Sequence, residues 1–234
     1  MTPFIRYQLV SYIQSLKVIP PTALIMAWII ILYAYKNVPI LSSYGVSSIA
    51  MYVTMTWVTM SIFALEGDSE KHLLFFQLGG KRKYLIGKWL TILMIMIPYL
   101  VIALFFPIVT NSFNGSMTVL LYTISIFSHI IFSMFGILAG TLFAATKLSG
   151  KKTAFLSAVC VIVMSIASKS IIELVPFMKW ILWMLPPVFQ VIEHMEGGRD
   201  LVLQESLIVD SIFVMVYLVV VTAVLIPLFI KKES

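Results

Sequence analysis

The amino-acid sequence predicts an all-α fold: a polytopic integral membrane protein with six transmembrane helices and both termini in the cytoplasm. The first observation is composition, because 61% of the 234 residues are hydrophobic and only 11% are charged. Soluble domains are close to half apolar and a quarter charged, so a water-soluble fold could not bury this much apolar surface. The second observation is six long apolar segments, since a helix needs about 20 apolar residues to cross a bilayer.

Short loops separate the six apolar segments, so residues 1–234 are expected to form a single transmembrane domain. The first segment opens with Pro20 and Pro21, which suit the start of a helix. The fourth segment is longer than a perpendicular span requires and is expected to tilt. The expected spans are residues 18–35, 45–65, 89–109, 117–146, 153–170 and 207–230.

The distribution of basic residues predicts the orientation of the spans. With the N-terminus inside, 12 of the 16 Lys and Arg residues lie on the cytoplasmic side, where such residues are normally enriched. A seventh span over residues 171–190 is disfavoured, because it would bury Glu173 and Lys179 and would move the basic C-terminus outside. The basic residues left outside are Lys36, Lys169, Lys179 and Arg199.

Residues 1–18 are expected to form an amphipathic helix on the inner membrane surface. Apolar side chains recur there at intervals of three and four residues, which places them close to one helical face. An N-terminal extension of the first span is the alternative interpretation. The apolar positions are Ile5, Leu9, Ile13 and Leu16.

The largest cytoplasmic loop contains a short predicted helix over residues 67–79. Asp68 or Ser69 can cap its start, and Gly79 with Gly80 can end it. Its apolar residues are expected to form one compact exposed surface, which either a partner protein or the lipid surface would cover. These residues are Leu73, Leu74, Phe75 and Phe76.

Two further segments carry structural signals. Gly136 and Gly140 lie four residues apart in the fourth span, a spacing that lets two helix backbones approach closely, either within the chain or across a dimer. Residues 171–190 are apolar and aromatic but interrupted by charges, which favours one or two short helices at the outer interface. The aromatic and proline residues of this outer hairpin are Phe177, Trp180, Trp183, Pro186 and Pro187.

Ionisable residues are scarce inside the expected spans. His129 lies near the middle of the fourth span and Asp210 near the outer end of the sixth. We expect His129 to be hydrogen-bonded within the helix bundle, with a substrate contact as the alternative, and Asp210 to be a cap or a surface charge. The lack of deep carboxylates argues against a carrier driven by protons or sodium.

Signatures of membrane enzymes are also missing from the sequence. Ser47 is expected at the outer end of a span, at a different depth from His129, which disfavours an intramembrane serine hydrolase. His72, His129 and His194 fall in three compartments, so no metal site is expected. The chain has no phosphate-binding loop, and its basic loops lack the aromatic pattern of a nucleic-acid binder.

The order of elements and the stretch Arg82-Lys83-Tyr84-Leu85-x-Gly87-Lys88 resemble the permease subunit of type-two ABC exporters. The shared order is an interfacial helix, six spans, a cytoplasmic helix between the second and third spans, and an outer hairpin before the last. The chain is similar in particular to the small permeases of staphylococcal exporters for amphipathic cytolytic peptides.

The resemblance implies two permease subunits, identical or paralogous, each docked on a separate ABC ATPase that binds ATP and Mg. This chain would then bind no cofactor, and it would sit in the plasma membrane of a bacterium. The interfacial helix would make a second contact with the ATPase, and the outer hairpin would gate the exit. The implied coupling residues are Asp68, Glu70, Lys71, His72, Leu73, Leu74, Phe75 and Phe76.

The resemblance also implies a hydrophobic or amphipathic substrate, such as a peptide toxin, a bacteriocin or a drug. The 14 Met and 16 Phe residues would suit the walls of such a path. The main alternative is a membrane immunity or assembly protein that binds a partner without transport. An intramembrane hydrolase is a third hypothesis, which the lack of paired catalytic groups disfavours.

Overall fold

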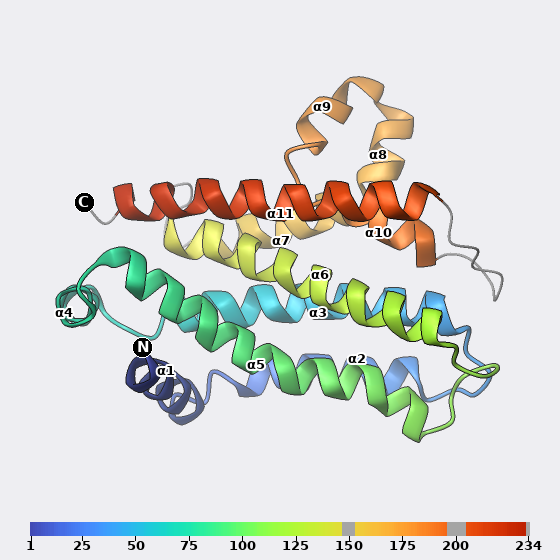
Figure 1. The fold of residues 1–234 in the computed structure, drawn as a ribbon, viewed down its shortest axis with the longest axis horizontal. Coiled ribbons are helices and arrows are strands. Elements are labelled where there is room, and N and C mark those ends of the chain that lie inside the picture. The colour runs from blue at the N-terminus through green and yellow to red at the C-terminus, as the bar shows by residue number, and fades with distance from the viewer. Residues whose placement is uncertain (147–152, 196–204, 233–234) are drawn as a thin grey trace.

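The computed structural model of the chain describes residues 1–146, 153–195 and 205–232. Within these ranges the secondary structure is helical, apart from an isolated bridge between Val38 and Phe113. Long helices run side by side along one axis, and the shorter α1 and α4 lie together at one end (Figure 1). This confirms the all-α class predicted from the sequence.

A helix covers most of each predicted apolar segment, although two helices begin earlier than predicted, at Ile40 and Lys81, and additional short helices precede the last long one. A 3₁₀ turn at Pro176–Met178 precedes α9, and another at Glu193–Met195 follows α10. The α-helices are α1 (Thr2–Gln14), α2 (Ile19–Leu32), α3 (Ile40–Phe63), α4 (Asp68–Leu78), α5 (Lys81–Val109), α6 (Val119–Ala145), α7 (Ala154–Ile166), α8 (Ser168–Leu174), α9 (Lys179–Leu182), α10 (Val188–Ile192) and α11 (Glu205–Lys232).

Four helices, α3, α5, α6 and α11, are long and apolar enough to cross a membrane. Two bent pairs pass the same test together: α1 with α2, at 76°, and α7 with α8, at 67°. The described residues therefore hold four spans, or up to six if each bent pair is one span. The first and fifth expected spans are shorter than predicted, because α2 has 14 residues and α7 has 13. These lengths give about 20 Å each, against about 30 Å for the hydrocarbon core.

The exterior of the bundle is strongly apolar. Ile212, Val216 and Val219 on α11 each expose more than half of their surface, and Ile97 and Phe105 on α5 do the same. A monomeric water-soluble protein rarely exposes such a continuous apolar surface. The arrangement indicates a protein embedded in a membrane, with these side chains toward lipid.

The centre of the bundle is the close packing of α3 against α6. A Cβ atom added at Gly136 would lie 2.6 Å from the carbonyl oxygen of Tyr52, and one added at Gly140 would lie 2.8 Å from that of Thr56. Both glycines are therefore needed for the approach of the two helix backbones. The face that sequence reasoning left open to a dimer is occupied by α3 of the same chain.

Candidate functional site

The predicted cytoplasmic helix is present as α4, at the same end of the bundle as α1 and the C-terminal end of α11 (Figure 1). Its start differs from the prediction, because the N-cap residue is Gly67 and no side chain caps the helix. Asp68 and Glu70 lie instead in the first turn, where a negative charge stabilises the helix dipole. Gly79 ends the helix in the left-handed region, with φ of 72°.

The apolar residues of α4 do not share one surface, which corrects the prediction. Phe75 is only 7% exposed, and its ring packs edge-on against Tyr84, with 4.9 Å between ring centroids, and against Phe229. Phe76 is 87% exposed and Leu73 is 57% exposed. Residues three apart share a helical face whereas adjacent residues do not, so Phe75 points inward while Leu73 and Phe76 point outward.

The other predicted coupling residues differ in exposure. Asp68, Glu70 and His72 are exposed. Lys71 and Leu74 are half-buried, and the ammonium group of Lys71 lies 5.8 Å from the centre of the Phe229 ring. Fewer of the predicted coupling residues are therefore fully exposed than the sequence suggested.

We expect Phe75→Ala to lower the free energy of unfolding by about 3 kcal/mol, because it removes a ring from the packing of α4 on α5 and α11. Phe76→Ala should change it by less than about 0.5 kcal/mol, because that ring has few partners to lose. Thermal unfolding of both variants in mild detergent tests this pair. An equal loss of unfolding free energy in the two variants would contradict the inward placement of Phe75.

A groove of about 400 Å³ separates α4 from α1. The hydroxyl of Tyr7 donates a hydrogen bond across it to the Glu70 carboxylate. The exposed side chain of Leu73 forms part of the wall, so the groove is continuous with the outward face of α4. The lining residues are Pro3, Phe4, Tyr7, Glu70, Leu73, Leu74, Gln77 and Leu78.

Helix α1 meets the bundle through a different face from the one predicted to lie on the membrane. Phe4, Gln8 and Tyr12 are buried against the protein. Of the four residues expected on the membrane face, Ile5 and Leu9 are half-buried and Ile13 and Leu16 are exposed. The helix ends at Gln14, so Leu16, with φ of 57°, lies beyond it.

A buried polar cluster, which sequence reasoning missed, holds α1 to the junction of α3, α4 and α5. Lys88 is fully buried, and its ammonium nitrogen lies 2.5 Å from Oε2 of Glu66. The same group donates to Oε1 of Gln8 at 2.8 Å and to the Ile62 carbonyl at 2.7 Å. The hydroxyl of Tyr84 also donates to Oε2 of Glu66, at 3.1 Å. We call Gln8, Glu66, Tyr84 and Lys88 the Lys88 cluster.

Part of the stretch on which the family resemblance rests is buried at this junction. Tyr84 and Leu85 are buried, and Lys88 pairs with Glu66. A Cβ atom at Gly87 would lie 2.5 Å from Cδ1 of Phe4, so only glycine leaves room for α1 to dock here. One sequence signal could have predicted the pairing of Glu66 with Lys88. Glu66 directly follows the second apolar segment and Lys88 directly precedes the third, so both lie at the same end of two consecutive spans.

His129 is the centre of a second buried polar group. Its Nε2 atom lies 2.8 Å from the hydroxyl of Ser47, and its Nδ1 atom lies 2.7 Å from the carbonyl of Ser125. The expectation that Ser47 and His129 differ in depth is therefore wrong, because α3 and α6 pack in a register that places them together. Both side chains are fully buried, so they satisfy each other and expose no atom to a substrate.

The outer hairpin is built from α8, α9 and the turns around them, and it projects from the bundle beyond α11 (Figure 1). Phe177, Trp180 and Trp183 expose more than half of their surface, whereas Pro186 and Pro187 are buried. The three rings thus form its outer surface, and the two prolines attach it to the bundle.

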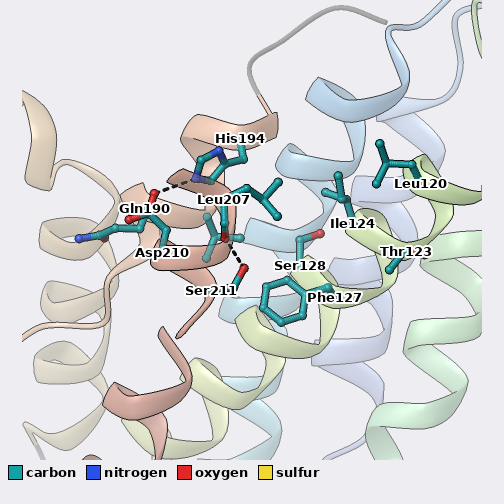
Figure 2. A pocket seen from close by; sticks show the side chains of 11 residues that line it. Leu120, Thr123, Ile124, Phe127, Ser128, Gln190, His194, Leu207, Asp210 and Ser211 are labelled. Carbon is teal, nitrogen blue, oxygen red and sulfur yellow. Dashed lines mark hydrogen bonds and ion pairs between the residues drawn. The ribbon is translucent and has the colours of Figure 1, made fainter. Parts of the chain in front are cut away.

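A pocket of about 220 Å³ lies between α6, α10 and α11 (Figure 2). Helix α10 lies at the end of the bundle opposite to α4 (Figure 1). Asp210, expected to be a cap or a surface charge, faces this pocket and accepts a hydrogen bond from Nε2 of His194 at 2.8 Å. The other lining residues are Leu120, Thr123, Ile124, Phe127, Ser128, Gln190, Val191, Leu207 and Ser211.

The predicted functional residues thus lie in separate regions, with α4 at one end of the bundle and the pocket at the other. In the part of the chain that the structure describes, no three His, Cys, Asp or Glu residues could together hold a metal ion. Comparison with protein-family models, with curated proteins and with solved structures found no match.

Proposed function

We propose that this chain is the membrane-spanning subunit of an ATP-driven ABC exporter, docked through α4 on a separate ATPase subunit. One observation carries the proposal: α4 is fixed to the bundle by Phe75 while Leu73 and Phe76 project away from it. Exposed apolar side chains on a rigid support are typical of a protein docking site. The resemblance to type-two ABC permeases also implies that this helix docks on the ATPase.

The anchoring of α4 supports a coupling role. Its inward ring contacts Tyr84 of α5 and Phe229 of α11, and the Lys88 cluster joins the neighbouring ends of α1, α3 and α5. A displacement of α4 by a partner would therefore act on several long helices at once, through packed and hydrogen-bonded contacts. ATP and Mg would bind to the ATPase, and this chain would bind no cofactor.

The proposed topology has six spans with both termini in the cytoplasm. It rests on the excess of Lys and Arg at the end of the bundle where α1, α4 and the C-terminal end of α11 lie. A second permease subunit, identical or paralogous, would complete the transport path in a bacterial plasma membrane. The cargo would be a hydrophobic or amphipathic peptide toxin, bacteriocin or drug.

We expect the double variant Leu73→Asp/Phe76→Asp to release the ATPase from the tagged permease. Two exposed apolar contacts are replaced by carboxylates, and a loss of about 3 kcal/mol would weaken binding more than a hundredfold. The measurement is affinity purification in mild detergent from cells that express the chain's own operon, followed by quantification of the ATPase.

The matched control is Val119→Asp, which adds a carboxylate at an exposed apolar position at the opposite end of the bundle. It should retain the ATPase. An ATPase that stays with the α4 double variant would contradict docking through α4. A wild-type chain that purifies without any ATPase would favour the immunity or assembly protein instead.

A further inference from the structure

The pocket between α6 and α11 combines an apolar wall with a single carboxylate. Figure 2 shows Leu120, Ile124 and Phe127 of α6 on one side, and His194 and Asp210 on the other. Leu207 extends the apolar wall on the α11 side (Figure 2). Among the described residues that line it, Asp210 is the one acidic group.

Asp210 has one hydrogen-bond partner in the described part of the chain. That partner is Nε2 of His194, and it occupies Oδ2 of the carboxylate. The Asp210 side chain is 30% exposed, so it remains reachable from the pocket. A carboxylate has two oxygens and about four acceptor positions, so His194 leaves most of its capacity unused. A carboxylate in apolar surroundings gains more from a cation than one in water does.

We infer that this pocket binds a cationic amphiphile, whose ammonium group pairs with Asp210 while its apolar part lies along Leu120, Ile124, Phe127 and Leu207. The pocket volume of about 220 Å³ is several times the roughly 30 Å³ that one water occupies in the liquid, so the pocket accommodates the head group and the first few carbon atoms of the chain. An anionic amphiphile would place two negative charges together and is rejected. That this amphiphile is the exported cargo rests on the proposed export function. That the pocket binds a cationic amphiphile does not rest on it.

His194 competes with the ligand for Asp210. The head group must share the carboxylate with the imidazole or displace it from Oδ2. Removing the ring therefore makes the carboxylate more available to a cation. This reasoning predicts opposite effects for the two members of the pair: substitution of Asp210 weakens binding, and substitution of His194 strengthens it.

The test uses two photoreactive probes with the same dodecyl chain and diazirine, one with an ammonium head group and one with a sulfate. The purified chain is reconstituted in phosphatidylglycerol nanodiscs, irradiated with each probe and digested, and labelled peptides are quantified by mass spectrometry. We express the labelling of residues 120–128 and 207–211 relative to that of the lipid-facing residues 97–105, because the anionic lipid itself attracts the ammonium probe. On this measure we expect the ammonium probe to label the pocket about tenfold more than the sulfate probe.

Three variants complete the test. Asp210→Asn should lower labelling by the ammonium probe about tenfold, and the control Glu173→Gln, which removes an exposed acidic charge elsewhere, should leave it unchanged. His194→Ala should raise labelling by the ammonium probe but not by the sulfate probe, whereas misfolding would expose apolar surface and raise labelling by both. Equal labelling by both probes, or unchanged labelling of Asp210→Asn, would overturn the inference and leave an unselective apolar cavity.

Competition identifies the source of the ammonium group. Loss of labelling with a lysine-containing amphipathic peptide, but not with phosphatidylethanolamine, supports a substrate site. The reverse result supports the ammonium site but overturns its role in binding cargo. Neither result depends on an ATPase, so failure here and failure of the proposed exporter function are separate outcomes.

Discussion

Replacing Lys88 with methionine should lower the free energy of unfolding by about 3–5 kcal/mol, the largest effect that we expect from one substitution. The ammonium group is fully buried and bonds to Glu66, Gln8 and the carbonyl of Ile62. Methionine fills a similar volume but leaves the Glu66 carboxylate, itself 2% exposed, without a cation. The cost is that of an uncompensated charge in a site that excludes water.

Thermal unfolding in mild detergent measures this effect. Lys83→Met is the matched control, because Lys83 lies on the same helix with an exposed side chain, and it should change stability by less than about 0.5 kcal/mol. The double variant Glu66→Gln/Lys88→Met should recover part of the loss, since no unpaired charge remains. If Lys88→Met is as stable as Lys83→Met, the Lys88 cluster does not hold this junction together.

Replacing both Gly136 and Gly140 with alanine should cost about 4 kcal/mol, although alanine is the better helix former at each position. The added Cβ atoms would meet the backbone oxygens of Tyr52 and Thr56 on α3 at 2.6 and 2.8 Å. Backbone atoms within a packed helix pair cannot move aside as a flexible side chain can. The two helices must therefore separate along their shared face, which contains the buried Ser47–His129 contact.

Gly45→Ala provides the control for this double variant. Gly45 lies inside α3, and an added Cβ would meet only the Met195 side chain, at 3.4 Å. We expect Gly45→Ala to be neutral or to stabilise by up to about 1 kcal/mol through the lower entropy of the unfolded chain. The measurement is the fraction of folded protein after heating, read by size-exclusion chromatography in detergent. A double variant as stable as Gly45→Ala would contradict the close packing of α3 on α6.

How far the candidate site could be predicted is clearest in α4. Its boundaries agree with the prediction to within one or two residues, because the acidic start and the paired glycines at its end are local signals. The orientation of Phe75 and Phe76 could not be predicted. Both are phenylalanine, and only the position of Tyr84 and Phe229 decides which ring is buried.

The sequence by itself determined the helical class, the membrane environment and the positions of the long apolar helices. These follow from composition and from the order of apolar and polar residues along the chain, which need no knowledge of neighbours. Only the tertiary structure decided the pairs Glu66–Lys88, Ser47–His129 and His194–Asp210, whose members are 22, 82 and 16 residues apart. Partners so distant in sequence are selected by the packing register of whole helices, because a shift of one residue turns a side chain by about 100°.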